Sequence, residues 1–165
     1  MINCYQKNKK IILGLDPGIA DTGFGIISVE NDKTKCLGFG SIKTSPQDDF
    51  LDRLEKLDDE LQKIIDEYQP EIVCIEKLFF NNNAKTALIV GQARGVVMLR
   101  IKKNNIKLVE LTPLQIKQGI SCFGGADKNQ VKKMVKLILN LKEAPKSDDA
   151  ADALAAAICA SSLRF

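Results

Sequence analysis

Apolar and polar positions along the first third of the chain predict three short strands. Residues 11–16 form a continuous apolar run that ends in Asp16 and is closed by a Pro-Gly turn, which is typical of a fully buried strand. Residues 22–30 and 35–43 are two further strand patterns with a short turn between them. Because short links join consecutive strands, we expect an antiparallel meander.

The rest of the chain alternates between helical and strand patterns. Apolar residues at helical spacing predict helices, and short apolar runs predict strands. We expect helices at residues 48–68, 84–102, 112–119, 127–141 and 148–162, and strands at residues 71–76 and 107–111. Adding these two strands in parallel to the first gives an α/β fold, a mixed five-stranded sheet with helices on both faces.

The predicted helix at residues 84–102 is apolar almost all round. Such a helix buries more than one face, whereas a sheet covers only one. We therefore expect the second face to pack against a partner, which makes the protein a homodimer.

The length of 165 residues fits a single domain with its own core. Residues 1–10 are polar and form an N-terminal arm, and residues 11–165 form the domain. The arm lacks the apolar region of a signal peptide, and no run approaches a membrane span. A cytoplasmic protein without membrane contact is the default expectation.

The sequence contains no histidine and five cysteines, none of them in a CxxC pair. Zinc centres and histidine-based catalytic triads are thereby excluded. A catalytic cysteine is not expected either, because no histidine can activate it. We interpret Cys74 and Cys159, which lie in apolar runs, as small core residues.

The net charge of +3 is unevenly distributed. Residues 48–67 carry nine acids and three bases, whereas residues 100–146 carry eleven bases and three acids. This asymmetry indicates one basic face suited to an anionic polymer. Lys132, on the predicted helix at residues 127–141, is expected to face outward and to contact DNA. Solvated lysines without a partner are the alternative.

Four carboxylates occupy positions that predict a common site. Asp16 and Glu76 each end an apolar strand, and Asp149 and Asp152 share one face of the alanine-rich last helix. Asp148 is expected to cap this helix or to be a solvated neighbour. Alternatives are that Asp16 caps its turn, or that the four acids are unrelated surface residues.

Four converging carboxylates repel one another and need shared protons or divalent cations. Carboxylate oxygens without histidine or cysteine suit Mg²⁺, and Mn²⁺ as a substitute. Two ions would then activate water and stabilise the leaving oxygen in phosphodiester hydrolysis. The sequence therefore predicts a metal-dependent nuclease.

Several segments resemble the RuvC-type Holliday-junction resolvases of bacteria. The matching stretches are ILGLDPG at 12–18, TGFG at 22–25, IEKLF at 75–79, GQARG at 91–95, KNQV at 128–131 and DAADALA at 149–155. The resemblance implies an RNase H-like homodimer that resolves four-way DNA junctions by paired symmetric nicks during recombination and repair. It also implies cooperation with the RuvA and RuvB branch-migration proteins.

The resemblance also implies roles for individual residues. Asp16, Glu76, Asp149 and Asp152 correspond to the four metal-binding, catalytic acids of the family. Lys117 and Lys128 correspond to catalytic basic residues that bind DNA near the scissile phosphate. Phe79 corresponds to an aromatic residue that meets bases at the junction centre, although a core phenylalanine beside Phe80 is the alternative.

Two other function classes compete with the nuclease. The Asp-Pro-Gly segment also resembles the first phosphate loop of actin-like sugar kinases and ATPases, but these need a second domain with another glycine-rich loop. A junction-binding module without catalysis is the other alternative. The complete set of four acids argues against it.

Overall fold

A computed structural model describes residues 9–31, 33–77, 84–121 and 124–163 of the chain. Its elements follow the predicted order: β1 (Lys10–Asp16), β2 (Asp21–Glu30), β3 (Lys33–Lys43), α1 (Phe50–Tyr68), β4 (Ile72–Glu76), α2 (Ala84–Lys103), β5 (Lys107–Leu111), α3 (Pro113–Ser121), α4 (Lys128–Ile138) and α5 (Asp148–Ser161). The first strand therefore begins inside the predicted N-terminal arm, whose residues 1–8 lie outside the described ranges.

The strands form one mixed sheet in the order β3-β2-β1-β4-β5. Strands β1 and β3 are antiparallel to β2, whereas β4 runs parallel to β1, and β5 runs parallel to β4. The predicted meander with two added parallel strands is confirmed. Because β1 and β4 run in the same direction, their carboxyl ends meet at one edge of the sheet.

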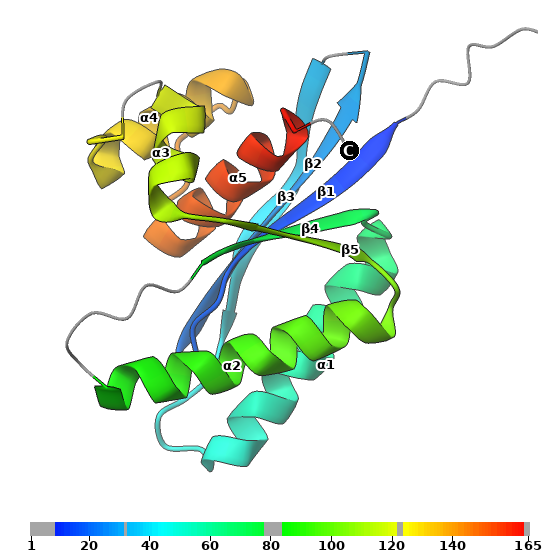
Figure 1. The fold of residues 1–165 in the computed structure, drawn as a ribbon, viewed down its shortest axis with the longest axis vertical. Helices are drawn as coiled ribbons and strands as arrows, with labels where there is room; N and C mark the ends of the chain where they lie inside the picture. The colour runs from blue at the N-terminus through cyan, green and yellow to red at the C-terminus, as the bar shows by residue number, and fades with distance from the viewer. Residues whose placement is uncertain (1–8, 32, 78–83, 122–123, 164–165) are drawn as a thin grey trace, which may run out of the picture.

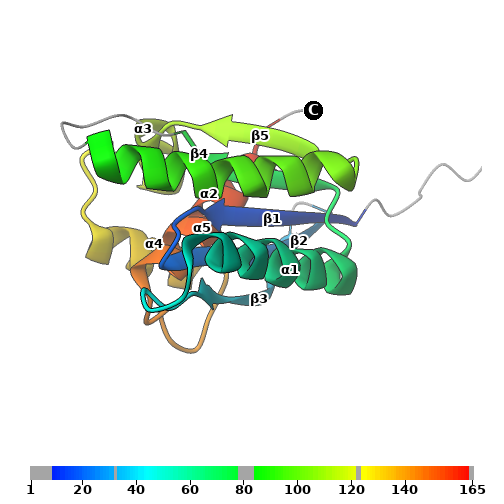
Figure 2. The ribbon, with the colours of Figure 1, turned by 90° about the horizontal axis from the view of Figure 1, so that it is seen from below.

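Helices cover both faces of this sheet (Figures 1 and 2). Helices α1 and α2 lie side by side on one face, and their apolar side chains share a core with Leu13, Leu15 and Ile75. Helix α5 lies on the other face, with α3 and α4 packed around it. Each face of the central strands is thus buried, which explains their continuous apolar runs.

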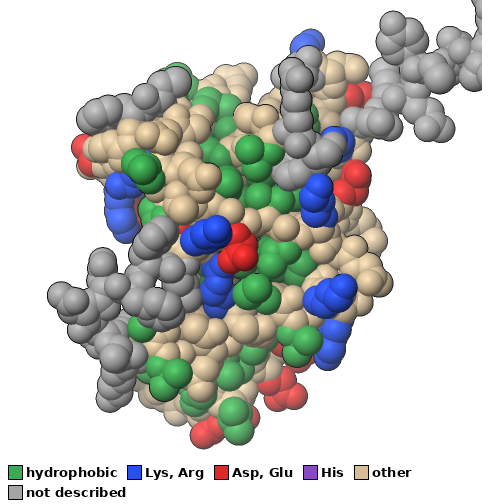
Figure 3. Space-filling model, in the orientation of Figure 1, with side chains coloured by type: hydrophobic (Ala, Val, Ile, Leu, Met, Phe, Trp, Pro, Cys, Tyr) green, Lys and Arg blue, Asp and Glu red, His purple; other side chains and the backbone are tan. Residues whose placement is uncertain are grey.

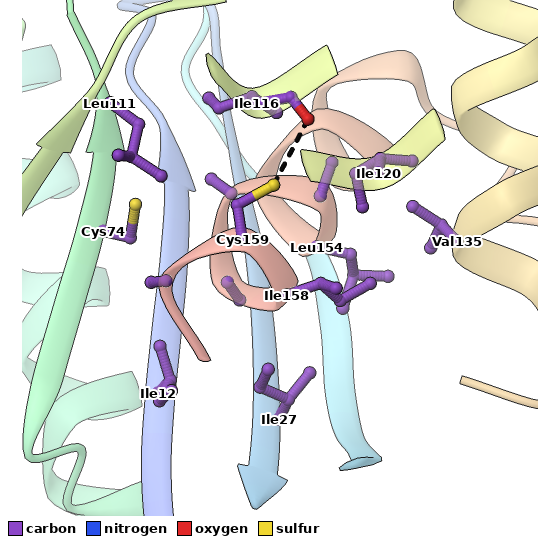
Figure 4. Close-up of a cluster of buried hydrophobic side chains, with 14 of the residues drawn as sticks. Ile12, Ile27, Cys74, Leu111, Ile116, Ile120, Val135, Leu154, Ile158 and Cys159 are labelled. Carbon is purple, nitrogen blue, oxygen red and sulfur yellow. Dashed lines mark hydrogen bonds between the residues drawn. The ribbon is translucent and has the colours of Figure 1, made fainter. Parts of the chain in front are cut away.

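The core on the α5 face combines the alanines of α5 with larger side chains of the strands, α3 and α4 (Figure 4). Cys74 and Cys159 are buried in it as predicted, and the Cys159 thiol donates to the carbonyl oxygen of Ile116 at 3.2 Å. Burial raises the pKa of Cys74 to about 12 and that of Cys159 to about 11. Both thiols are therefore neutral packing groups.

The helix starts are set by side-chain caps. Asp127 and Gln130 form a reciprocal capping box at α4, and Thr112 and Gln115 form the same pair of contacts at α3. At α5 the cap is Ser147, whose hydroxyl accepts from the Ala150 amide. The prediction that Asp148 caps this helix is wrong, because its carboxylate lies in the first turn and pairs with lysines of α4.

No helix in the described ranges combines the length and hydropathy that crossing a bilayer requires.

Helix α5 approaches the sheet at backbone distance. A methyl group on Gly14 of β1 would overlap the carbonyl oxygen of Ala153, and one on Gly23 of β2 would overlap that of Asp149. The helix in turn presents alanine to the strands, and its residues 153–157 are almost completely buried. This contact fixes the position of α5 over the carboxyl end of β1.

We expect Gly14→Ala to destabilise the protein by about 1–3 kcal/mol, because a well-packed interface has no room for another methylene. Urea denaturation of the variant and of the wild type measures this difference. An unchanged free energy of unfolding would contradict the direct contact between helix and strand.

Candidate active site

Two of the predicted acids end neighbouring strands. Asp16 is the last residue of β1 and Glu76 the last of β4, and the parallel register pairs Leu15 with Ile75 just before them. Side chains alternate along a strand, and Leu15 and Ile75 pack against α1 and α2. The carboxylates of Asp16 and Glu76 therefore point to the opposite face, toward α5.

The other two acids come from the start of α5. Asp149 lies against Gly23, which is the antiparallel partner of Asp16. Asp152 follows one turn later on the same helix. The close contact between helix and sheet thus brings acids from three elements to one edge of the sheet, as the sequence predicted.

Burial and the charges of the neighbouring acids change the electrostatics of Asp16. Burial, followed by the negative charges of Asp152, Glu76 and Asp149, raises the pKa of Asp16 to about 7. The pKa of Glu76 is raised by burial and then by Asp152, while Lys117 and Arg94 oppose the rise. Burial also raises the pKa of Asp152. Desolvation and like charges thus act together to disfavour ionised carboxylates.

The donor set fits a hard divalent cation. The site offers carboxylate oxygens from four residues, and the whole sequence has no histidine, which favours Mg²⁺ or Mn²⁺ over zinc. Within the described ranges, no three acidic or cysteine side chains lie close enough together to ligate one ion as they stand. The four carboxylates would have to rotate toward a shared ion in order to bind it together.

Basic side chains line a hollow beside these acids. The hollow has a volume of about 230 Å³ and is lined by two acids, Glu76 and Asp152, and by two bases, Lys117 of α3 and Lys128 of α4. Apolar residues of α3 and α4 also line it. A phosphate group placed here would contact both lysines and the acids. The catalytic roles of these lysines stay predictions.

Lys128 and Lys132 share one carboxylate. Nζ of Lys128 lies 3.3 Å from Oδ2 of Asp148, and Nζ of Lys132 lies 2.5 Å from Oδ1 of the same residue. Lys132 also donates to the carbonyl oxygen of Lys146 at 3.1 Å, and its side chain is only 20% exposed. Hydrogen bonds from Lys132 and Lys128 lower the pKa of Asp148. The DNA contact predicted for Lys132 remains a prediction.

Phe79 lies outside the described residues, so its predicted contact with junction bases stays a prediction. The basic face predicted from the charge distribution is not continuous in the view of Figure 3. There, acidic and basic side chains are interspersed among exposed apolar ones.

Two residues that the structure places beside the site make contacts that the sequence did not predict. Arg94 is a buried arginine whose guanidinium contacts Glu76, and Asp148 holds Lys128. An arginine within an otherwise apolar helix is a signal that could have singled out Arg94, because arginine is almost never buried unpaired. Nothing in the local sequence distinguishes Asp148 from a solvated acid.

Comparison with known proteins identifies the family. The model of the family "Crossover junction endodeoxyribonuclease RuvC" matches residues 12–160. The RuvC of Alkaliphilus oremlandii is 52% identical over 149 residues, which cover 90% of this chain and 91% of that protein. The RuvC of Finegoldia magna is 51% identical over 148 residues, covering 90% of each.

A solved structure agrees with these relatives. Thermus thermophilus RuvC in complex with a Holliday junction substrate superimposes with a TM-score of 0.84 and 32% sequence identity, over 92% of each chain. This likeness confirms the RNase H-like fold. The chain belongs to the RuvC family of crossover junction endodeoxyribonucleases.

Proposed function

We propose that Asp16, Glu76, Asp149 and Asp152 hold two Mg²⁺ ions, with which this chain hydrolyses phosphodiester bonds at the centre of a four-way DNA junction. Membership in the RuvC family makes the chain a nuclease that resolves Holliday junctions. The identity of the metal, the number of ions and the role of each residue are our proposals. Mn²⁺ has the same ligand preference and would substitute.

The observation that carries this proposal is the convergence of four carboxylates, from the ends of β1 and β4 and the start of α5, at one edge of the sheet. Two elements, β4 and α5, bring three further carboxylates to Asp16, and burial together with these charges raises its pKa to about 7. Two unit charges 4 Å apart interact by about 4 kcal/mol at an effective dielectric constant of 20. Divalent cations would remove this repulsion, and no cationic side chain of the described residues pairs with Asp16 in a salt bridge.

The chemistry that two divalent cations supply is activation of the attacking water and stabilisation of the leaving oxygen. The protein's own groups position the substrate around them. Lys117 and Lys128 line the same hollow as Glu76 and Asp152, where their charges would hold the scissile phosphate and stabilise charge in the transition state. Binding of that phosphate would compete with Asp148 for Lys128.

Paired cleavage of two strands requires two active sites, and α2 offers a surface for a second subunit. Two large apolar side chains of this helix are exposed to solvent, Leu88 by 66% and Leu99 by 56%. We therefore propose a homodimer, in which each subunit nicks one strand. Cooperation with RuvA and RuvB, and a cytoplasmic location, are parts of the same proposal that follow from the family and its DNA substrate.

The two competing function classes lose support. A non-catalytic junction module would have no reason to keep four carboxylates at a desolvated strand edge, where they destabilise the fold. An actin-like kinase needs a second nucleotide-binding loop, and the family match spans residues 12–160 without one.

Neutralising single acids tests the metal site. We expect Asp16→Asn, Glu76→Gln and Asp152→Asn each to slow nicking of a synthetic four-way junction in Mg²⁺ by about 100-fold or more, since metal ligation supplies several kcal/mol to the transition state. Junction binding, measured by gel shift in EDTA, should be retained.

Asp127→Asn is the matched control for these variants. It removes an acid near the site but preserves the helix cap, because asparagine caps as well as aspartate. Its cleavage rate should equal that of the wild type. Cleavage by Asp16→Asn at the wild-type rate would refute the proposed metal site.

Stability without metal should fall as the pH rises. The folded-state pKa of Asp16 is about 7, compared with an ordinary value of 3.8. Its stabilising contribution is therefore full below about pH 4 and is lost as the pH rises through 7, by at most about 4 kcal/mol.

Urea denaturation in EDTA at pH 5 and pH 8 measures this effect. The wild type should lose more stability between the two pH values than Asp16→Asn, and adding Mg²⁺ should reduce the difference because the cation binds only the folded state. Equal pH dependence of the wild type and the variant would contradict the electrostatic description of Asp16.

The lysines that line the hollow give a further test. Lys117→Ala and Lys128→Ala should slow cleavage by about 10- to 100-fold at saturating junction concentration, with a modest loss of binding. Lys133→Ala removes an exposed lysine of the same helix α4 and should cut like the wild type. Wild-type rates in both site variants would show that these lysines are only solvated.

A further inference from the structure

Arg94 is a buried cation in the middle of helix α2. Its side chain is only 9% exposed. Arginine at such a position requires partners for its charge and its five N–H groups. Among the described residues the guanidinium has two: Nη1 donates to the carbonyl oxygen of Glu76, and Nη2 forms a salt bridge with the carboxylate of Glu110 on β5.

The contact reaches Glu76 from the side opposite its carboxylate. Ile75 packs into the core on the α1 and α2 face, whereas Cys74 packs on the α5 face. By strand alternation, the Glu76 side chain points to the α5 face, where the other acids lie. Arg94 therefore contacts the backbone of Glu76 from the α1 and α2 face of the sheet, whereas the predicted ion would lie on the α5 face.

This backbone stands at the last position of the strand ladder. The pairing of β4 with β5 ends at Glu76 and Leu111, and the next amide, of Lys77, donates to the carbonyl oxygen of Leu111 at 2.7 Å. The carbonyl of Glu76 is bound by the guanidinium. Because a planar guanidinium engages two oxygens in fixed directions, it restricts the strand end more than a single hydrogen bond would.

We propose that Arg94 is a positioning residue of the nuclease, whose guanidinium joins the end of β4 to Glu110 of β5 and thereby directs the Glu76 carboxylate toward the metal ions. This inference rests on the proposed function of Glu76 as a metal ligand. Glu110 serves as the counterion that keeps Arg94 in place. Groups that orient metal ligands from behind commonly change metal affinity or activity by about 10- to 100-fold when removed.

The competing interpretation is that Arg94 only attaches α2 to the sheet. Arg100 offers a matched control, because it lies on the same helix and its guanidinium pairs with Asp58 and Gln62 of α1. Both arginines bind α2 to a neighbour through a carboxylate, but only Arg94 contacts a site residue. Arg100→Gln therefore reports what loss of packing alone does.

The experiment compares Arg94→Gln, Arg94→Lys, Glu110→Gln, Arg100→Gln and Asp16→Asn in the full chain. Cleavage of a synthetic four-way junction is measured under single-turnover conditions over a range of Mg²⁺ concentrations. Thermal unfolding without DNA, over the same range, reports metal binding independently of activity.

If Arg94 positions Glu76, Arg94→Gln should cut about 10-fold more slowly or worse and need more Mg²⁺ for half of its thermal stabilisation. Arg94→Lys, which keeps the charge but not the fork, should recover part of the rate. Glu110→Gln should act in the same direction with a smaller effect, which keeps the test decisive if Arg94→Gln fails to fold. Arg100→Gln should cut normally even if it melts earlier.

Wild-type cleavage and Mg²⁺ dependence in the folded Arg94 variants, or equal losses in Arg100→Gln, would overturn the inference. Asp16→Asn separates this failure from failure of the proposed function. If Asp16→Asn is inactive while the Arg94 variants are normal, only the role of Arg94 is refuted. If Asp16→Asn cuts normally, the metal site itself is refuted.

Discussion

The arrangement of the site depends on the contact between the backbone of α5 and the strands beneath it. Gly14 and Gly23 leave no side chain between β1, β2 and the helix, so the helix backbone rests on the sheet. A conventional layer of leucine or valine would hold a helix about 10 Å from the strands. At the closer distance, Asp149 and Asp152 can approach the carboxylate of Asp16, whose short side chain reaches only a little way from the strand end.

The same contact has an electrostatic cost, which the rest of the site partly offsets. The acids lie near the amino-terminal end of α5, where the helix dipole favours negative charge. Lys117, Lys128 and Arg94 all lower the pKa of Glu76, against the effects of burial and Asp152. The balance still leaves Asp16 with a raised pKa. Function here has been built at the expense of stability, as is common for active sites.

Local sequence was sufficient to predict much of this architecture. An apolar run ending in one acid located Asp16 and Glu76, and a three-residue spacing on an alanine-rich helix located Asp149 and Asp152. These signals are local because strand burial and helix faces follow from short-range periodicity. The three-residue spacing of Thr112 and Gln115 likewise marked the start of α3.

What local sequence could not reveal are contacts between residues distant along the chain. Glu110 is the partner of Arg94, and Lys128 and Lys132 are the partners of Asp148. Ser147 and Asp148 are both good capping residues, and in the structure Ser147 caps α5 while Asp148 pairs with these lysines. Local sequence also does not show which glycines of the strands contact the backbone of α5, because that depends on how the helix packs on the sheet.

The alanine layer of α5 has a consequence for genetics. Ala153 and Ala157 lie against Gly14 of β1 and are not among the predicted ligands, yet they help to determine how near the helix carries its acids to the strand end. A larger residue at either position would lift the helix and separate the carboxylates. A mutational screen scored by junction cleavage would therefore recover these buried alanines together with the acids, and a map of inactivating substitutions would trace the helix–sheet seam as well as the chemistry.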